Sequence, residues 1–461
     1  MCKLTMTNRK LRRPQKTNRP LTLAAMLVSL LLGGSAALAS EVKTQWTYKE
    51  LWLHVKQVHP LADIAEAELD DFRAKLTHSE RWWYPRMSAN NILAGLPGEG
   101  SVLNDRTDFN NWGPYLRSDA SLSVPLYTFG RVKALKAMAR SGLSLGNAKR
   151  SIANETMRSQ LDQAVLGLLY ARELKGLLED GQKELRRAKE ILLEEEENDD
   201  ESYDPTDKLR LKLVDLELRD QALEAESLEA QAMTGLRLLG QFPKDYTPNL
   251  SFSLADLIKL RVPDATECLT IAKDERPEVK QVLALQNLRN RELDLAQANF
   301  MPQLLIGGFA RYSYAQVNDE IRDENSADTL NYLEGGAGLV LSWNFDWASL
   351  NRKVEESNAA VQKASAQTKA LLLSLELEVE HAHASYTSAK ARLRNAKRAE
   401  KASRGIMAAK LNLYEAGLGK FDPAASAVRS HFERRYQTIK NRFTMAQATL
   451  KLLRTIGRSD R

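Results

Sequence analysis

The chain has 461 residues, a formal net charge of +6 and two cysteines. Residues 1–39 have the pattern of a secretory leader, with seven Lys and Arg, no Asp or Glu, an apolar core and small residues before Ser40. We expect this segment to be removed as a signal peptide, which lowers the net charge to −1 and leaves Cys268 as the single thiol. This composition argues against nucleic-acid binding and excludes an intramolecular disulfide in the expected mature chain.

Landmark residues recur 217 positions apart along the chain. Pro60 returns as Pro277 and Pro85 returns as Pro302, so the two prolines stand 25 residues apart in each copy. A period this long indicates duplicated domains, because solenoid repeats are only about 20–50 residues long. The sequence therefore predicts this division: 40–240 as a first repeat, 241–276 as an irregular connecting segment, 277–457 as a second repeat, and 458–461 as a tail.

Each copy is expected to begin with a helix and a pair of strands. A helical pattern of apolar residues follows Pro60 and Pro277, and proline is well tolerated at a helix start. The strands are expected at about 82–93 and 116–126 in the first copy and at about 302–314 and 333–345 in the second. Long polar loops, 95–114 and 315–331, are expected between the strands of each pair.

The second strand of each pair alternates between apolar and polar residues. Leu116, Leu122 and Leu126 fall on one side, whereas Arg117 and Asp119 fall on the other. Alternation is also typical of a half-buried strand in a soluble sheet, but these strands have about the 9–11 residues of a tilted membrane crossing. Tryptophans gather in or beside the strands, as in the interfacial girdles of membrane strands: Trp82, Trp83, Trp112, Trp343 and Trp347. We therefore favour a membrane sheet. The smallest bacterial barrels have about eight strands, so several chains would have to share one.

A very long helix and a returning helix are expected after each strand pair. The long helices cover about 131–198 and 349–416, and the returning helices cover 206–240 and 424–456, after the N-cap candidates Asp204 and Asp422. The first returning helix carries two seven-residue series: Leu209, Leu216, Leu223 and Ala230; and Leu211, Leu218, Ala225, Ala232 and Leu239. Two series on one helix predict packing against neighbours on both sides. The lengths predict that the short and returning helices stack end to end beside the long one.

Five segments together resemble the TolC-like outer membrane efflux protein family. They are Glu275–Glu278 (ERPE), Ala298–Pro302 (ANFMP), Ser123–Arg131 (SVPLYTFGR), Tyr414–Gly419 (YEAGLG) and Leu452–Gly457 (LLRTIG). The resemblance covers nearly the whole expected mature chain.

The resemblance implies a mainly α fold with β-strands, in which the duplicated unit supplies long antiparallel coiled-coil helices of an α-barrel and four strands per chain. It further implies a homotrimer with a shared 12-stranded membrane β-barrel in the outer membrane and its helices in the periplasm. A periplasmic adaptor (membrane fusion) protein and an inner-membrane transporter are the implied partners, with outer membrane lipid around the strands and no nucleic acid.

No catalytic motif occurs in the sequence: it has no Walker loop, GxSxG elbow, HExxH or paired-cysteine metal site. We therefore expect no enzyme, cofactor or metal. The expected function is an exit duct for efflux or type I secretion that conducts substrates passively. The alternative is a secreted or periplasmic coiled-coil scaffold without channel activity.

The tips of the two helical hairpins are the candidate pore mouth and adaptor contact. The first tip is strongly acidic, which is typical of a solvated hairpin end, although carboxylates near a helix C-terminus are disfavoured by its dipole. Three such tips at a pore mouth would form an anionic ring, whereas adaptor contact is implied by the resemblance. The candidate residues are Glu194, Glu195, Glu196, Glu197, Asp199, Asp200, Tyr203, Asp204, Asp207, Gly417, Gly419, Lys420 and Asp422.

Overall fold

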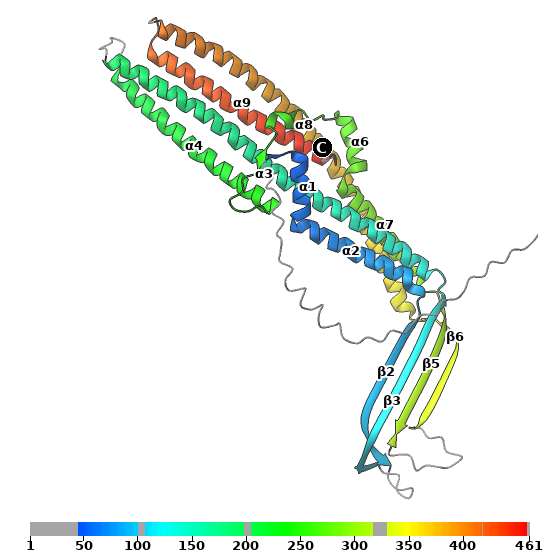
Figure 1. The fold of residues 1–461 in the computed structure, drawn as a ribbon. Helices are drawn as coiled ribbons and strands as arrows, with labels where there is room; N and C mark the ends of the chain where they lie inside the picture. The colour runs from blue at the N-terminus through cyan, green and yellow to red at the C-terminus, as the bar shows by residue number, and fades with distance from the viewer. Residues whose placement is uncertain (1–44, 100–106, 198–203, 317–329, 417, 459–461) are drawn as a thin grey trace, which may run out of the picture.

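The molecule is elongated, with a four-stranded sheet at one end and the tips of two helical hairpins at the other (Figure 1). The computed structural model describes residues 45–99, 107–197, 204–316, 330–416 and 418–458. The expected signal peptide, residues 1–39, lies outside the described residues.

The same order of elements occurs twice along the chain. The first half contains α2 (Pro60–Glu80), β2 (Arg86–Glu99), β3 (Thr107–Tyr127), α3 (Arg131–Glu197) and α4 (Pro205–Gly240). The second half contains α7 (Pro277–Ala298), β5 (Gln303–Ala315), β6 (Tyr332–Ser342), α8 (Trp347–Glu415) and α9 (Phe421–Thr455). The expected helices after Pro60 and Pro277 are confirmed, and each of these prolines stands at a helix start, where its missing N–H costs no hydrogen bond.

Shorter elements lie near the middle of the molecule. They are β1 (Gln45–Trp46), α1 (Tyr48–Val58), β4 (Asn249–Leu250), α5 (Leu254–Ile258) and α6 (Ala265–Glu275). A 3₁₀ turn at Arg81–Trp83 lies instead between α2 and β2, where the helices meet the sheet. The expectation that 241–276 is irregular was therefore wrong in part. A capping box of Ser253 and Asp256 starts α5, and Cys268 and Ala272 of α6 are fully buried.

The strands form one antiparallel sheet in the order β2-β3-β5-β6. The expected loop 95–114 was wrong, because β2 continues to Glu99 and β3 begins at Thr107. Pro97 is tolerated there because the register shifts between Pro97 and Gly98, so the ladder is already interrupted at this point. Gly95 leaves room for Trp112, whose Cε3 would lie 3.3 Å from an added Cβ. Residues 317–329 of the other expected loop lie outside the described part of the chain.

The helices pack lengthwise, as the lengths predicted. The helix α3 packs along α4 toward the tips and along α2 toward the sheet, and α8 packs along α9 and α7 in the same way (Figure 1). With 67 residues, α3 is about 100 Å long. The two halves meet where α3 contacts α7 and α9. None of the helices in the described ranges is long and apolar enough to cross a membrane.

The two apolar series of α4 have different environments. Leu211 and Ala225 are buried in the contact with α3. Leu209, Leu216 and Leu223 of the other series are 54–66% exposed. The single chain thus covers one series and leaves the other open.

The largest apolar core lies midway along the molecule, where the short elements meet the long helices. Leu51 and Val55 of α1, Leu161 of α3, Leu236 of α4 and Leu254 of α5 have no exposed surface there. This core holds the ends of α2 and α4 in place beside α3, so it fixes the position of the sheet relative to the tips.

We predict that Gly457→Ala destabilises the protein. Gly457 has a φ of +79°, and an added Cβ would lie 2.8 Å from the backbone nitrogen of Arg276. The left-handed conformation alone costs a non-glycine residue about 1–2 kcal/mol. The matched control is Gly176→Ala, in the middle of α3 with open space around it, which should gain about 0.5–1 kcal/mol. Thermal unfolding followed by circular dichroism should show a lower midpoint for the first variant only; equal midpoints would contradict this account.

Candidate functional site: the polar sheet face and the helix tips

The two faces of the sheet differ in chemistry. One face carries apolar side chains that remain exposed, among them Leu93 at 81% and Leu333 at 79%. The pairing places Leu116 and Leu122 of β3 on this same face. The other face carries Ser121, Ser123 and a group of charged residues. Such two-sided alternation is typical of a strand with lipid on one side and water on the other.

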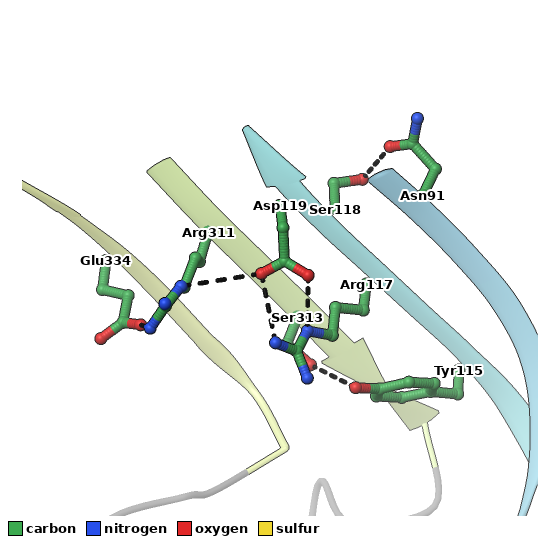
Figure 2. A network of polar contacts seen from close by, with 8 residues as sticks. All are labelled: Asn91, Tyr115, Arg117, Ser118, Asp119, Arg311, Ser313 and Glu334. Carbon is green, nitrogen blue, oxygen red and sulfur yellow. Dashed lines mark hydrogen bonds and ion pairs between the residues drawn. The ribbon is translucent and has the colours of Figure 1, made fainter. Parts of the chain in front are cut away.

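The charged residues on the polar face are connected across three strands (Figure 2). Arg117 donates from Nε to Oδ2 of Asp119 over 2.8 Å and from Nη2 to Oδ1 over 3.3 Å. Arg311 of β5 lies with Nε 3.8 Å from the same Oδ1 and donates from Nη1 to Glu334 of β6 over 3.1 Å. We call these four residues, Arg117, Asp119, Arg311 and Glu334, the charge belt. It connects β3, from the first half of the chain, to β5 and β6, from the second.

At the far end of the molecule, the C-terminal turn of α3 contacts the other hairpin. Tyr414, at the end of α8, donates a hydrogen bond to the carboxylate of Glu195. Glu196 is paired with Lys208 of α4, whereas Glu194 and Glu197 are exposed. The structure therefore brings part of the acidic tip into contact with the second hairpin. The candidates Asp199, Asp200, Tyr203 and Gly417 lie outside the described residues.

A second contact joins the tips through Arg210 of α4. Its Nη1 lies 3.0 Å from Asp207 and 2.8 Å from Asp422 of α9. Burial raises the pKa of Asp207, and the charge of Arg210 opposes that rise. The expectation that Asp422 caps α9 was wrong: the helix begins at Phe421 after Lys420, and Asp422 pairs with Arg210 instead.

The expected cap at Asp204 is confirmed. Its side chain accepts a hydrogen bond of 2.8 Å from the backbone N–H of Thr206, which lowers the pKa of the carboxyl. At the second tip, Gly419 packs closely enough that an added Cβ would lie 3.2 Å from the backbone nitrogen of Tyr414.

Sequence reasoning missed a row of ion pairs between α3 and α9. Arg435 pairs with Asp180 over 2.9 Å, and Arg442 pairs with Glu173 over 2.6 Å. The hydrogen bond from Arg435 lowers the pKa of Asp180, whereas burial raises the pKa of Glu173 despite its pairing with Arg442. The signal was present, because both the acids and the arginines are seven residues apart. The acids lie on α3 in the first half of the chain and the arginines on α9 in the second half, so their pairing depends on the tertiary contact between these helices.

Comparison with known proteins gives the same fold. Residues 269–458 match the family model described as outer membrane efflux protein. This part of the chain, residues 269–458, carries the outer membrane efflux protein domain. The resemblance drawn from the sequence is thereby confirmed, and the protein lies in the outer membrane with its helices in the periplasm.

Solved structures of TolC-like proteins share the fold over most of the chain. VceC from Vibrio cholerae has a TM-score of 0.69 at 15% identity and covers 89% of this chain and 95% of its own. The MtrE outer membrane channel of Neisseria gonorrhoeae has a TM-score of 0.70 at 16% identity, with 89% of each chain covered. The CmeC outer membrane channel of Campylobacter jejuni has a TM-score of 0.68 at 14% identity and covers 89% of this chain and 85% of its own. No curated protein sequence matches the chain.

Proposed function

We propose that the chain is the outer membrane exit channel of a tripartite efflux or type I secretion system. Three copies would each contribute four strands to a shared 12-stranded β-barrel. Their helices would continue the barrel as a tunnel into the periplasm. Substrates would pass through without an energy source in the channel itself, driven by an inner-membrane transporter and delivered through a periplasmic adaptor.

The observation that carries this proposal is the incomplete sheet. Within the described chain, the outer edges of β2 and β6 have no neighbouring strand. One face of the sheet is apolar and exposed, as a face toward lipid would be. In lipid every backbone N–H and C=O needs a hydrogen-bond partner, so free edges are excluded there. Closure with further copies satisfies both edges at once and puts the charge belt inside.

The open apolar series of α4 supports the same assembly. Leu209, Leu216 and Leu223 are spaced like the seam of a coiled coil, yet they remain exposed in the single chain. A neighbouring copy would cover them, because α4 and α8 are the outer helices of the layer formed by α4, α3, α9 and α8 near the tips. Repeats at 40–240 and 277–457 would then alternate around the tunnel, with 241–276 at its equator.

We further propose that the tips form the entrance and contact the adaptor. The exposed carboxylates of Glu194 and Glu197 support an anionic ring, since they lie near the C-terminus of α3, where the helix dipole gives them no stabilisation. The contacts of Glu195 with Tyr414 and of Asp422 with Arg210 would hold the two hairpins together in a narrow entrance.

Neutralising the tip tests the anionic ring. A variant with Glu194, Glu195, Glu196 and Glu197 all replaced by Gln should reduce the preference of the channel for cations in planar bilayers, because up to twelve negative charges are removed from three copies. The control replaces Glu292 of α7 and Glu376, near the middle of α8 and far from its tip, by Gln and should leave ion selectivity unchanged. Equal selectivity of the tip variant and wild type would refute the anionic ring.

The assembly itself is tested by two substitutions in the open series. Leu216→Glu with Leu223→Glu should reduce the heat-modifiable trimer in outer membrane fractions by roughly tenfold or more, since burying each leucine contributes about 1.5–3 kcal/mol. Gln221→Glu, an acidic change at an exposed position of α4 on a different face from the open series, should leave the trimer intact. Recovery of the wild-type chain as a soluble periplasmic monomer would instead support the coiled-coil scaffold.

A further inference from the structure

The charge belt lies on a single row of the sheet. The pairing aligns Asn90 of β2, Asp119 of β3, Arg311 of β5 and Glu334 of β6 across all four strands. Arg117 stands two residues from Asp119 on the same face and reaches it with two hydrogen bonds. Closing several sheets side by side would therefore repeat this row around the inside of the barrel.

The belt contains all the charged residues in the central parts of the strands. Between 87–98, 109–127, 303–315 and 332–342, the sequence has only Arg117, Asp119, Arg311 and Glu334 as charged side chains. Two positive and two negative groups make the belt neutral. The remaining residues of these strand segments are small, apolar or uncharged, so no other fixed charge in them competes with the belt.

The belt is positioned for contact with solutes and not only for stability. The side chains of Arg311 and Glu334 are each 48% exposed, whereas Asp119, which both arginines approach, is 25% exposed. Exposed ion pairs of this kind contribute little to stability, about 0–1 kcal/mol in general, and the strand register is already set by the backbone ladder. The main effect of these charges is therefore the electrostatic potential that they create over the polar face of the sheet.

Arg311 is held in place by the residues beneath it. Its guanidinium lies over the ring of Phe309, with Cζ 5.0 Å from the ring centroid. Gly336 on β6 allows this ring to lie flat against the strand, because an added Cβ there would be 3.2 Å from Cε1 of Phe309. The cation–π contact and the bond to Glu334 together fix the guanidinium above the sheet.

We propose that the charge belt is the part of the barrel that sets its preference among charged solutes, with Arg311 and Glu334 as the groups that solutes meet. This inference rests on the proposed channel function. Asp119 and Glu334 together balance the two arginines, so the belt as a whole favours neither sign. Removal of one member leaves an unbalanced charge in each copy, repeated around the ring.

Single-channel recording of the purified full-length protein in planar bilayers tests the proposal, with a potassium chloride gradient as the probe. Asp119→Asn leaves an excess positive charge and should lower the cation-to-anion permeability ratio. Arg311→Gln leaves an excess negative charge and should raise it. The expected change is roughly two- to fivefold in each direction, the effect of a unit charge at contact distance in water.

Two further variants separate charge from structure. Arg311→Lys keeps the charge while losing the fork of the guanidinium, and should retain the wild-type ratio. The double variant Arg117→Gln/Asp119→Asn removes one charge of each sign, and should also retain it, although it breaks the bidentate hydrogen bond. A role in sheet stability alone would give all four variants the same loss of assembled trimer and no opposite shifts.

The outcomes for the belt and for the channel are distinguishable. Conducting channels whose permeability ratio is the same in Asp119→Asn, Arg311→Gln and wild type would overturn the charge belt and leave the exit channel standing. Absence of conductance from the wild-type protein would overturn the proposed function. If Asp119→Asn does not assemble, Glu334→Gln, on the edge strand with one hydrogen bond to lose, should lower the ratio in the same way; an unchanged ratio there would overturn the belt.

Discussion

Backbone hydrogen bonding at the edges of the sheet is the constraint on which the rest of the structure depends. The described chain pairs β3 and β5 on both sides but leaves β2 and β6 with one neighbour each. In an outer membrane these edges are too costly to leave open, because lipid offers no hydrogen-bond partner. The apolar face, the exposed aromatic residues near the helices and the free edges are all explained by the proposal that the sheet is a segment of a larger closed surface made from several copies.

The helices resemble the sheet in leaving part of their contact surface uncovered in the single chain. Each long helix uses one apolar seam within the chain, and α4 retains a second seam that the chain does not cover. The ion pairs between α3 and α9 join the two halves into one layer, while Arg210 and Tyr414 join them again at the tips. A unit that leaves edges open at the sheet and seams open along the helices is suited to ring formation. In such a ring the charge belt would surround the path of the solute, and its charges could then act on passing ions.

The sequence predicted the elements better than their contacts. Proline at the start of α2 and α7 and the seven-residue periodicity are local signals, so helix positions were correct within a few residues. The length of β2 and β3 was missed, because Gly95, Pro97 and Gly113 suggest a loop until the register shift after Pro97 and the packing of Trp112 are known. Asp422 has the local pattern of a cap but pairs with Arg210, 212 residues away. In the sequence, the charge belt was visible only as the alternation of apolar and polar residues along the strands. Its pairing could not be predicted, because Arg117 and Asp119 lie in the first half of the chain and Arg311 and Glu334 in the second.

Cysteine cross-linking between the two edge strands tests the central claim most directly. Met87 of β2 and Leu341 of β6 are 80% and 62% exposed on the apolar face near the helix ends of their strands, whereas the native Cys268 is buried. The double variant Met87→Cys/Leu341→Cys, treated in intact outer membranes with a short bismaleimide, should give covalent dimers and trimers and nothing larger on denaturing gels. Each single variant should give no trimer. Monomers alone from the double variant, in a protein that fractionates with the outer membrane, would contradict the shared barrel.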